Sequence, residues 1–210
     1  MFKLISGNEK QRKSEVKSFA KKRGYVFNEG DWILNKYLHE SFHKKGEFGN
    51  KLDYFFQFNM DSNLFEFMDS RYFEHFFAGI PRTAFYRRQS VLFVDLRQYG
   101  LNFPDFFINT KGLINSYFCK DVCGYNTVNV EGHKLFSKRF ILRGFEKKAI
   151  RSIFNSDVLN FFEKKKGRFT LEVKNNQLIF YTSWRRINLQ KDFDKFSKDF
   201  LDIIEVFKKF

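Results

Sequence analysis

The alternating pattern of residues 168–184 constrains the fold more than any other stretch of this sequence. Apolar residues occupy every second position at its start, namely Phe169, Leu171 and Val173. This is the period of a β-strand that buries one face. Asn175 and Asn176 interrupt the run before β-prone residues resume at 178–182. Because asparagine tolerates positive φ, the pair predicts a two-residue turn in an antiparallel hairpin.

The segments before this hairpin predict one strand and two helices. Residues 139–143 favour a strand, and apolar residues recur at helical spacing over 145–154 and again after Ser156. Ser156 is a good N-cap residue, and Gly167 stands where a glycine would end the second helix. The expected order is therefore strand, helix, helix, hairpin.

The end of the chain, residues 188–210, predicts an amphipathic helix. Its apolar stripe is spaced by three or four residues and consists of Phe193, Phe196, Phe200, Ile203 and Phe207. Lysine and aspartate residues lie opposite this stripe. We expect this helix to cover a sheet.

The first half of the chain predicts further elements. Helices are expected at residues 14–24 and 31–46, each bounded by capping residues and a glycine. Period-two patterns predict a hairpin over 51–68 and a central strand at 89–97. Residues 72–86 have no clean period and contain Gly-Ile-Pro, which favours a long surface loop suited to partner contact. A short strand at 106–109 and a short helix at 113–118 follow.

These elements predict an α+β fold with an antiparallel or mixed sheet of five to seven strands and helices mainly on one face. We expect a single domain over residues 1–210. Within it, residues 1–50 would be mainly helical and residues 51–210 would contain the sheet.

The second half of the chain also resembles a group of uncharacterised bacterial proteins that carry a domain of unknown function. The matching residues are Pro104-Asp105-Phe106, Phe136-Ser137, Phe140-Ile141-Leu142-Arg143-Gly144, Ala149-Ile150, Ile153-Phe154 and 159–163. A looser match covers residues 89–96, and the stretch from Asp69 to Tyr72 lacks one tyrosine of the group's pattern. The resemblance implies a bacterial origin and an α+β domain, and it carries over no catalytic residue.

Composition supports a globular protein and sets limits on its location. Hydrophobic residues are 43% and charged residues 30% of the chain, which is unlike a disordered protein. No apolar run is long enough to cross a bilayer, and the apolar start is too short for a secretory signal. We therefore expect a cytoplasmic protein.

The net charge of +14 has two interpretations. A basic surface could attract phosphate backbones or anionic membranes. Alternatively, an AT-rich genome raises the lysine, asparagine and phenylalanine content without any partner. The even spread of basic residues, interrupted by acids, favours the second interpretation.

The sharpest chemical motif is the HExxH pattern formed by His39, Glu40 and His43. On a helix the two histidines share one face and can ligate zinc, while the glutamate can act as general base. Gly49 occupies the position of a third histidine ligand in one zinc-protease class. An ordinary amphipathic helix is therefore favoured, and a zinc-dependent hydrolase stays an alternative.

The two cysteines, Cys119 and Cys123, form a C-x3-C pair with His133 as the nearest further ligand. Structural zinc requires four ligands, and redox pairs usually have two intervening residues. We expect reduced, structural cysteines and no cofactor.

Basic residues next to aromatic ones raise a nucleic-acid alternative. One group contains Arg82, Phe85, Tyr86, Arg87 and Arg88, and another contains Lys164, Lys165, Lys166, Arg168, Trp184, Arg185 and Arg186. Charge neutralisation and base stacking hold single strands in this way. However, the sequence contains no signature of a known nucleic-acid-binding module.

The sequence therefore predicts a non-catalytic protein-interaction or regulatory module of a bacterial cytoplasm. No P-loop, nucleophile elbow or dinucleotide fingerprint is present. The expected partner is a protein, contacted through residues 72–86. We predict no catalytic, cofactor-binding or metal residue.

Overall fold

A nine-stranded antiparallel sheet forms the centre of the computed structural model, which describes residues 2–29, 51–60, 62–75, 84–111, 125–182 and 186–209. The strands are β1 Val26–Asn28, β2 Lys51–Met60, β3 Asn63–His75, β4 Ala84–Asp95, β5 Phe106–Thr110, β6 Asn126–Thr127, β7 Phe140–Gly144, β8 Phe169–Lys174 and β9 Gln177–Thr182. Their order is β1-β2-β3-β4-β9-β8-β5-β7-β6, and every neighbouring pair is antiparallel. The predicted α+β class with an antiparallel sheet is confirmed.

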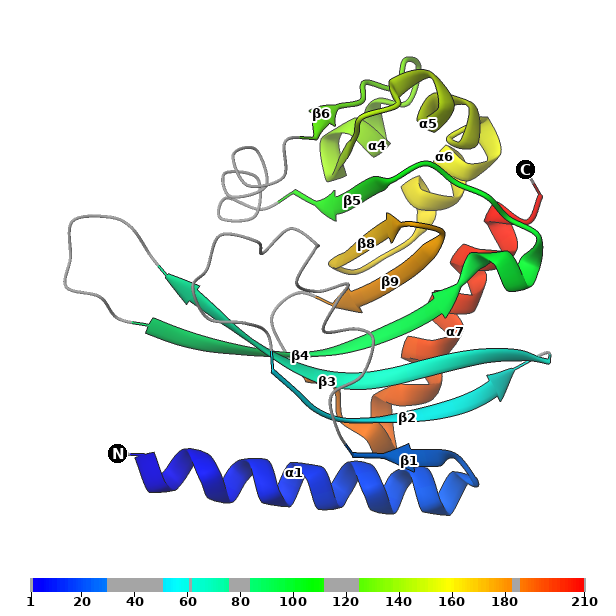
Figure 1. Ribbon diagram of the computed structural model, residues 1–210. Helices are drawn as coiled ribbons and strands as arrows, with labels where there is room; N and C mark the ends of the chain where they lie inside the picture. The colour runs from blue at the N-terminus through cyan, green and yellow to red at the C-terminus, as the bar shows by residue number, and fades with distance from the viewer. Residues whose placement is uncertain are drawn as a thin grey trace.

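The described helices lie on one face of this sheet. They are α1 Phe2–Arg23, α4 Lys134–Arg139, α5 Lys147–Ile153, α6 Ser156–Lys164 and α7 Leu189–Phe207, with a 3-10 turn η1 at Leu96–Tyr99. Each of the five α-helices contributes buried residues to the main hydrophobic cluster. Figure 1 shows α1 beside β1 and β2 at one end, α4 to α6 at the other, and α7 crossing behind the strands.

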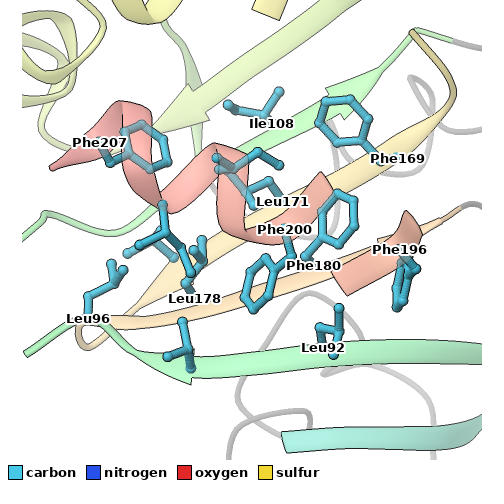
Figure 2. Close-up of a cluster of buried hydrophobic side chains, with 14 of the residues drawn as sticks. Leu92, Leu96, Ile108, Phe169, Leu171, Leu178, Phe180, Phe196, Phe200 and Phe207 are labelled. Atoms are coloured by element: carbon cyan, nitrogen blue, oxygen red, sulfur yellow. The ribbon is translucent and has the colours of Figure 1, made fainter. Parts of the chain in front are cut away.

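The phenylalanine stripe of α7 packs against the sheet as predicted. Phe200 stacks on Phe180 of β9 with ring centroids 5.6 Å apart, and it meets Phe65 of β3 edge-on at 5.9 Å. Phe193 contacts Phe67 of β3 in the same edge-on manner. Figure 2 shows the rings of Phe196, Phe200 and Phe207 directed at side chains from β4, β5, β8 and β9. Aromatic rings from the helix and the strands therefore fill this core.

The hairpin turn at Asn175 and Asn176 is confirmed by its backbone. Both residues have positive φ, at 50° and 62°, which is the geometry of the primed turns that match strand twist. The Asn176 side chain also accepts a hydrogen bond from the Phe103 N–H, at 2.8 Å. The same residue therefore turns the hairpin and fixes the approach to β5.

Several predicted boundaries are wrong. The sheet has nine strands and not five to seven, because β1 and β6 are three and two residues long, too short to show alternation. The first helix begins at Phe2, well before Ser14. Asn155 and not Ser156 caps α6, and α6 ends at Lys164, before Gly167.

The predicted loop over residues 72–86 is also wrong at both ends. Residues 72–75 belong to β3 and residues 84–86 to β4, where they pair with each other. The helices predicted at 31–46 and 113–118 lie outside the described residues.

Gly144, the last residue of β7, lies close to Asp105 and to Ile150 of α5. A Cβ at this position would lie 2.7 Å from the backbone oxygen of Asp105 and would clash with the Cδ1 atom of Ile150. A glycine is therefore required for α5 to pack against the end of β7.

Candidate interaction surfaces

The predicted metal motifs receive no support from the described residues. His39, Glu40 and His43 lie outside them, as do Cys119 and Cys123. Within the described ranges, no group of three or more His, Cys, Asp or Glu side chains could hold a metal ion.

His133, the third residue proposed with the cysteines, has a structural contact. Its Nδ1 lies 3.5 Å from Glu163 Oε1, which also accepts a hydrogen bond from the Phe136 N–H at 3.0 Å. His133 therefore stands at the start of α4, where Glu163 links that helix to α6.

Arg186, one of the predicted nucleic-acid residues, is instead part of an internal ionic network. Its Nη1 and Nη2 donate to the two carboxylate oxygens of Glu9 at 3.1 and 2.8 Å, and its Nε lies 3.5 Å from Asp69 Oδ2. The nucleic-acid interpretation is therefore wrong for this residue. Arg82, Trp184 and Arg185 lie outside the described residues.

Asp69 is the centre of this network and is fully buried. Its Oδ2 accepts from Arg12 Nε at 2.6 Å, and its Oδ1 accepts from the Ser90 hydroxyl. Arg12 Nη2 also donates to the Ile187 carbonyl at 2.9 Å, while Ser90 Oγ accepts from the Ile187 N–H at 3.1 Å. The network thus joins α1, β3, β4 and the segment that leads into α7.

Tyr54 borders the same network from β2. It is paired with Asp69 in the sheet register, and its hydroxyl is buried without a hydrogen-bond partner. Burial raises the pKa of the Tyr54 phenol, and the nearby charge of Asp69 raises it further. We interpret the network as a structural clamp, because buried charges are retained where they are paired.

The opposite face of the sheet has its own buried cluster, made entirely of strand residues. These are Phe55, Met68, Val91, Phe93 and Ile179, with Tyr181 packed beside them. Polar residues flank the cluster, and Glu66 is among them. Glu66 is 3% exposed, its Oε1 accepts from Gln57 Nε2 at 2.7 Å, and its Oε2 has no hydrogen-bond partner.

Glu66 is expected to make the stability of the protein depend on pH. Burial raises the pKa of its carboxyl to about 7, although the hydrogen bond from Gln57 lowers it. Between the ordinary carboxyl pKa and about 7, the folded state binds more protons than the unfolded state. The free energy of unfolding should therefore fall by about 1–3 kcal/mol as pH rises through this interval.

Urea denaturation at pH 5 and pH 8 measures this effect. The Glu66→Gln variant should lose most of the pH dependence, because its amide cannot ionise. The exposed Glu131→Gln variant should keep the wild-type dependence. Equal pH dependence in the wild type and the Glu66→Gln variant would contradict the assignment.

β3 and β4 extend past the strands on either side of them. β2 pairs with β3 only as far as Arg71, and β9 pairs with β4 only from Val91. Among the described strands, residues 72–75 therefore pair only with residues 84–87, and we name these two segments the β3–β4 ribbon. Figure 1 shows β3 and β4 projecting together beyond the other strands.

The ribbon is rich in aromatic residues and adjoins arginines. Its register places Tyr72 opposite Arg87, Phe73 opposite Tyr86 and Glu74 opposite Phe85. Aromatic residues and arginine are the types enriched at protein interfaces. Arg87 and Arg88, predicted to bind nucleic acid, thus belong to β4 in and next to this ribbon.

The remaining predicted basic residues are divided between a paired lysine and exposed ones. Lys165 Nζ donates to Asp199 Oδ1 at 2.7 Å. Lys164, Lys166 and Arg168 are exposed.

No helix within the described ranges is long and apolar enough to span a bilayer.

Comparison with known proteins identifies a similar fold. No family model and no curated protein matches the chain. The structure is similar to the crystal structure of the mycobacterial trehalose monomycolate transport factor A, TtfA, with a TM-score of 0.53. The match covers 94% of this chain and 92% of that one at 9% sequence identity. At this identity, the similarity concerns the fold alone.

Proposed function

We propose that this protein is a non-catalytic protein-interaction module of a bacterial cytoplasm and that the β3–β4 ribbon carries its partner contact. The observation on which the proposal depends is the projection of the ribbon beyond β2 and β9. A projecting strand pair offers a partner the outer backbone edges of both strands, because neither β2 nor β9 pairs with this part of them.

The chemistry of the ribbon suits a protein partner. Strand edges without a neighbour present N–H and C=O groups that an extended peptide can pair with. Four of the eight residues of the ribbon are aromatic, namely Tyr72, Phe73, Phe85 and Tyr86. Aromatic side chains contribute a large contact area at small entropic cost, which makes them common anchors of interfaces.

The edges of the whole sheet are short by comparison. β1 and β6, which close the sheet, contain three and two residues. Short edge strands limit unspecific pairing with other chains. Within the described part of the chain, the ribbon is therefore the strand segment that extends past the neighbouring strands.

The similar fold of a transport factor supports an accessory role for this chain. TtfA is named for its part in transporting trehalose monomycolate. A shared fold does not transfer that cargo to this protein. It supports only the proposal of an accessory role.

Site-specific photo-crosslinking in the source cells tests the proposal. A benzoylphenylalanine at Phe85 should yield a discrete adduct with a second protein. The same group at Lys22, on the exposed side of α1, is the matched control and should yield no such adduct. Absence of an adduct at position 85, or the same adduct from both positions, would contradict the proposal.

A further inference from the structure

Three separate segments at the end of the molecule that contains α4 and α6 carry five exposed basic residues. We name this group the basic corner: Lys111, Lys138, Lys164, Lys166 and Arg168. Arg139 holds the segments together, because its Nη1 donates to the Glu163 carbonyl at 2.9 Å and its Nη2 to the Lys165 carbonyl at 2.6 Å.

Backbone contacts complete this arrangement. The Lys111 N–H donates to the Arg139 carbonyl at 2.6 Å. Thr110 Oγ1 accepts from the Phe169 N–H at 3.1 Å, which places Arg168 next to the end of β5. The three segments that carry the five cations are therefore neighbours in space, because hydrogen bonds join them.

No described acid forms an ion pair with a residue of the basic corner. All five side chains are exposed, and no ion pair within the described residues involves any of them. Asp199 pairs with Lys165 and not with a residue of the corner. Glu163 accepts a hydrogen bond from the Phe136 N–H and keeps its negative charge, and Glu131, before α4, is exposed.

An exposed leucine accompanies these cations. Leu135 is 60% exposed and lies on α4 between Lys134 and Lys138. It precedes Phe136, whose N–H is bonded to Glu163, so it stands close to the start of the Lys164–Lys166 run. An apolar side chain among lysines is the combination that binds an anionic bilayer surface.

We propose that the basic corner docks on an anionic membrane surface, with Leu135 entering the headgroup region. Single-stranded nucleic acid is less well matched, because its binding uses exposed aromatic rings for base stacking. Among the described large hydrophobic side chains, the exposed aromatic one is Phe145, which lies at the opposite end of β7 and packs against Tyr125. The proposal is independent of the β3–β4 ribbon and goes beyond the proposed protein contact.

Vesicle co-sedimentation with the full chain tests the proposal. The protein should bind vesicles of phosphatidylcholine containing about one third phosphatidylglycerol and should not bind phosphatidylcholine alone. Binding should weaken as salt is raised, because salt screens exposed charges. Each basic residue near the surface contributes about a fivefold factor, so the Lys138→Gln, Lys164→Gln, Lys166→Gln triple variant should bind about a hundredfold more weakly.

A second triple variant with the same change in charge is the control. Lys10→Gln, Lys21→Gln and Lys22→Gln alter exposed positions on α1, at the other end of the sheet (Figure 1). This variant should bind anionic vesicles within about a threefold factor of the wild type. Leu135→Ala should weaken binding severalfold while keeping the salt dependence, because it removes apolar contact and no charge.

Three results would overturn the proposal. The first is that the protein does not bind the anionic vesicles. The second is that both triple variants lose the same vesicle affinity, which would show that binding depends only on the net charge of the protein. The third is that the wild type binds a mixed-sequence oligonucleotide more tightly than it binds the vesicles, and that the basic-corner variant no longer binds the oligonucleotide. This result would assign the corner to nucleic acid. The photo-crosslink from Phe85 should persist in the basic-corner variant, so failure of one proposal is distinguishable from failure of the other.

Discussion

Replacing Asp69 with asparagine is expected to lower the free energy of unfolding by about 3 kcal/mol. The carboxylate is fully buried and lies within 2.6 Å of Arg12 Nε and 3.5 Å of Arg186 Nε. An asparagine would leave these guanidinium groups without their shared anion. The loss of one partner from a buried pair is costly because the remaining charge stays out of water.

Urea denaturation of the variant and of a matched control measures this loss. Asp194→Asn removes the same charge from an exposed pair with Arg23, whose N–O distance is 2.9 Å. Exposed pairs contribute about 0–1 kcal/mol, so this control should be nearly as stable as the wild type. Equal stability of the two variants would show that Asp69 does not clamp α1 to the sheet.

Truncating Phe200 to alanine is expected to cost about 3–5 kcal/mol of unfolding free energy. The ring is 1% exposed and lies between rings from two strands, Phe180 and Phe65. Its removal would leave a cavity where α7 meets the middle of the sheet. Rigid strands on one side limit how far that cavity can collapse.

The matched control for this substitution is Phe145→Ala. Phe145 is 60% exposed, so its truncation should cost less than about 1 kcal/mol. If the slope of unfolding free energy against denaturant concentration is the same in both variants, the difference between their denaturation midpoints measures a difference in stability alone. A Phe200→Ala variant as stable as Phe145→Ala would mean that α7 does not cover the sheet.

Regular alternation of apolar and polar residues made much of this fold predictable. Phe169, Leu171 and Val173 alternate with polar residues because one face of β8 joins the main apolar core, whereas Thr170 and Glu172 on the other face are polar, although they are buried as well. The stripe of α7 has helical spacing for the same reason. Wherever a long element buries one face, its sequence period reports its type.

The ionic clamp was missed because its members are far apart in the chain. Arg12 and Asp69 are 57 positions apart, and no local spacing connects them. One signal was nonetheless available. Asp69 follows Phe65 and Phe67 at period two, so a strand assignment places a carboxylate on the buried face and requires a buried partner.

The β3–β4 ribbon was interpreted as a loop for a related reason. Alternation of apolar and polar residues indicates a strand with one buried face, and the ribbon residues do not alternate. Tyr72 and Phe73 are adjacent, as are Phe85 and Tyr86, so no period was visible. Contact by this region stays a prediction, and its backbone conformation is corrected from loop to strand.

Amide hydrogen exchange measured on the free protein, and again with the partner identified by crosslinking, tests the central claim most directly. In the free protein, amides of residues 84–87 should exchange quickly, whereas those from β8 and β9 should exchange slowly. The partner should slow exchange at residues 72–75 and 84–87 by at least about tenfold and leave β8 and β9 unchanged. Protection elsewhere, with the ribbon still exchanging quickly, would contradict the claim that the ribbon carries the contact.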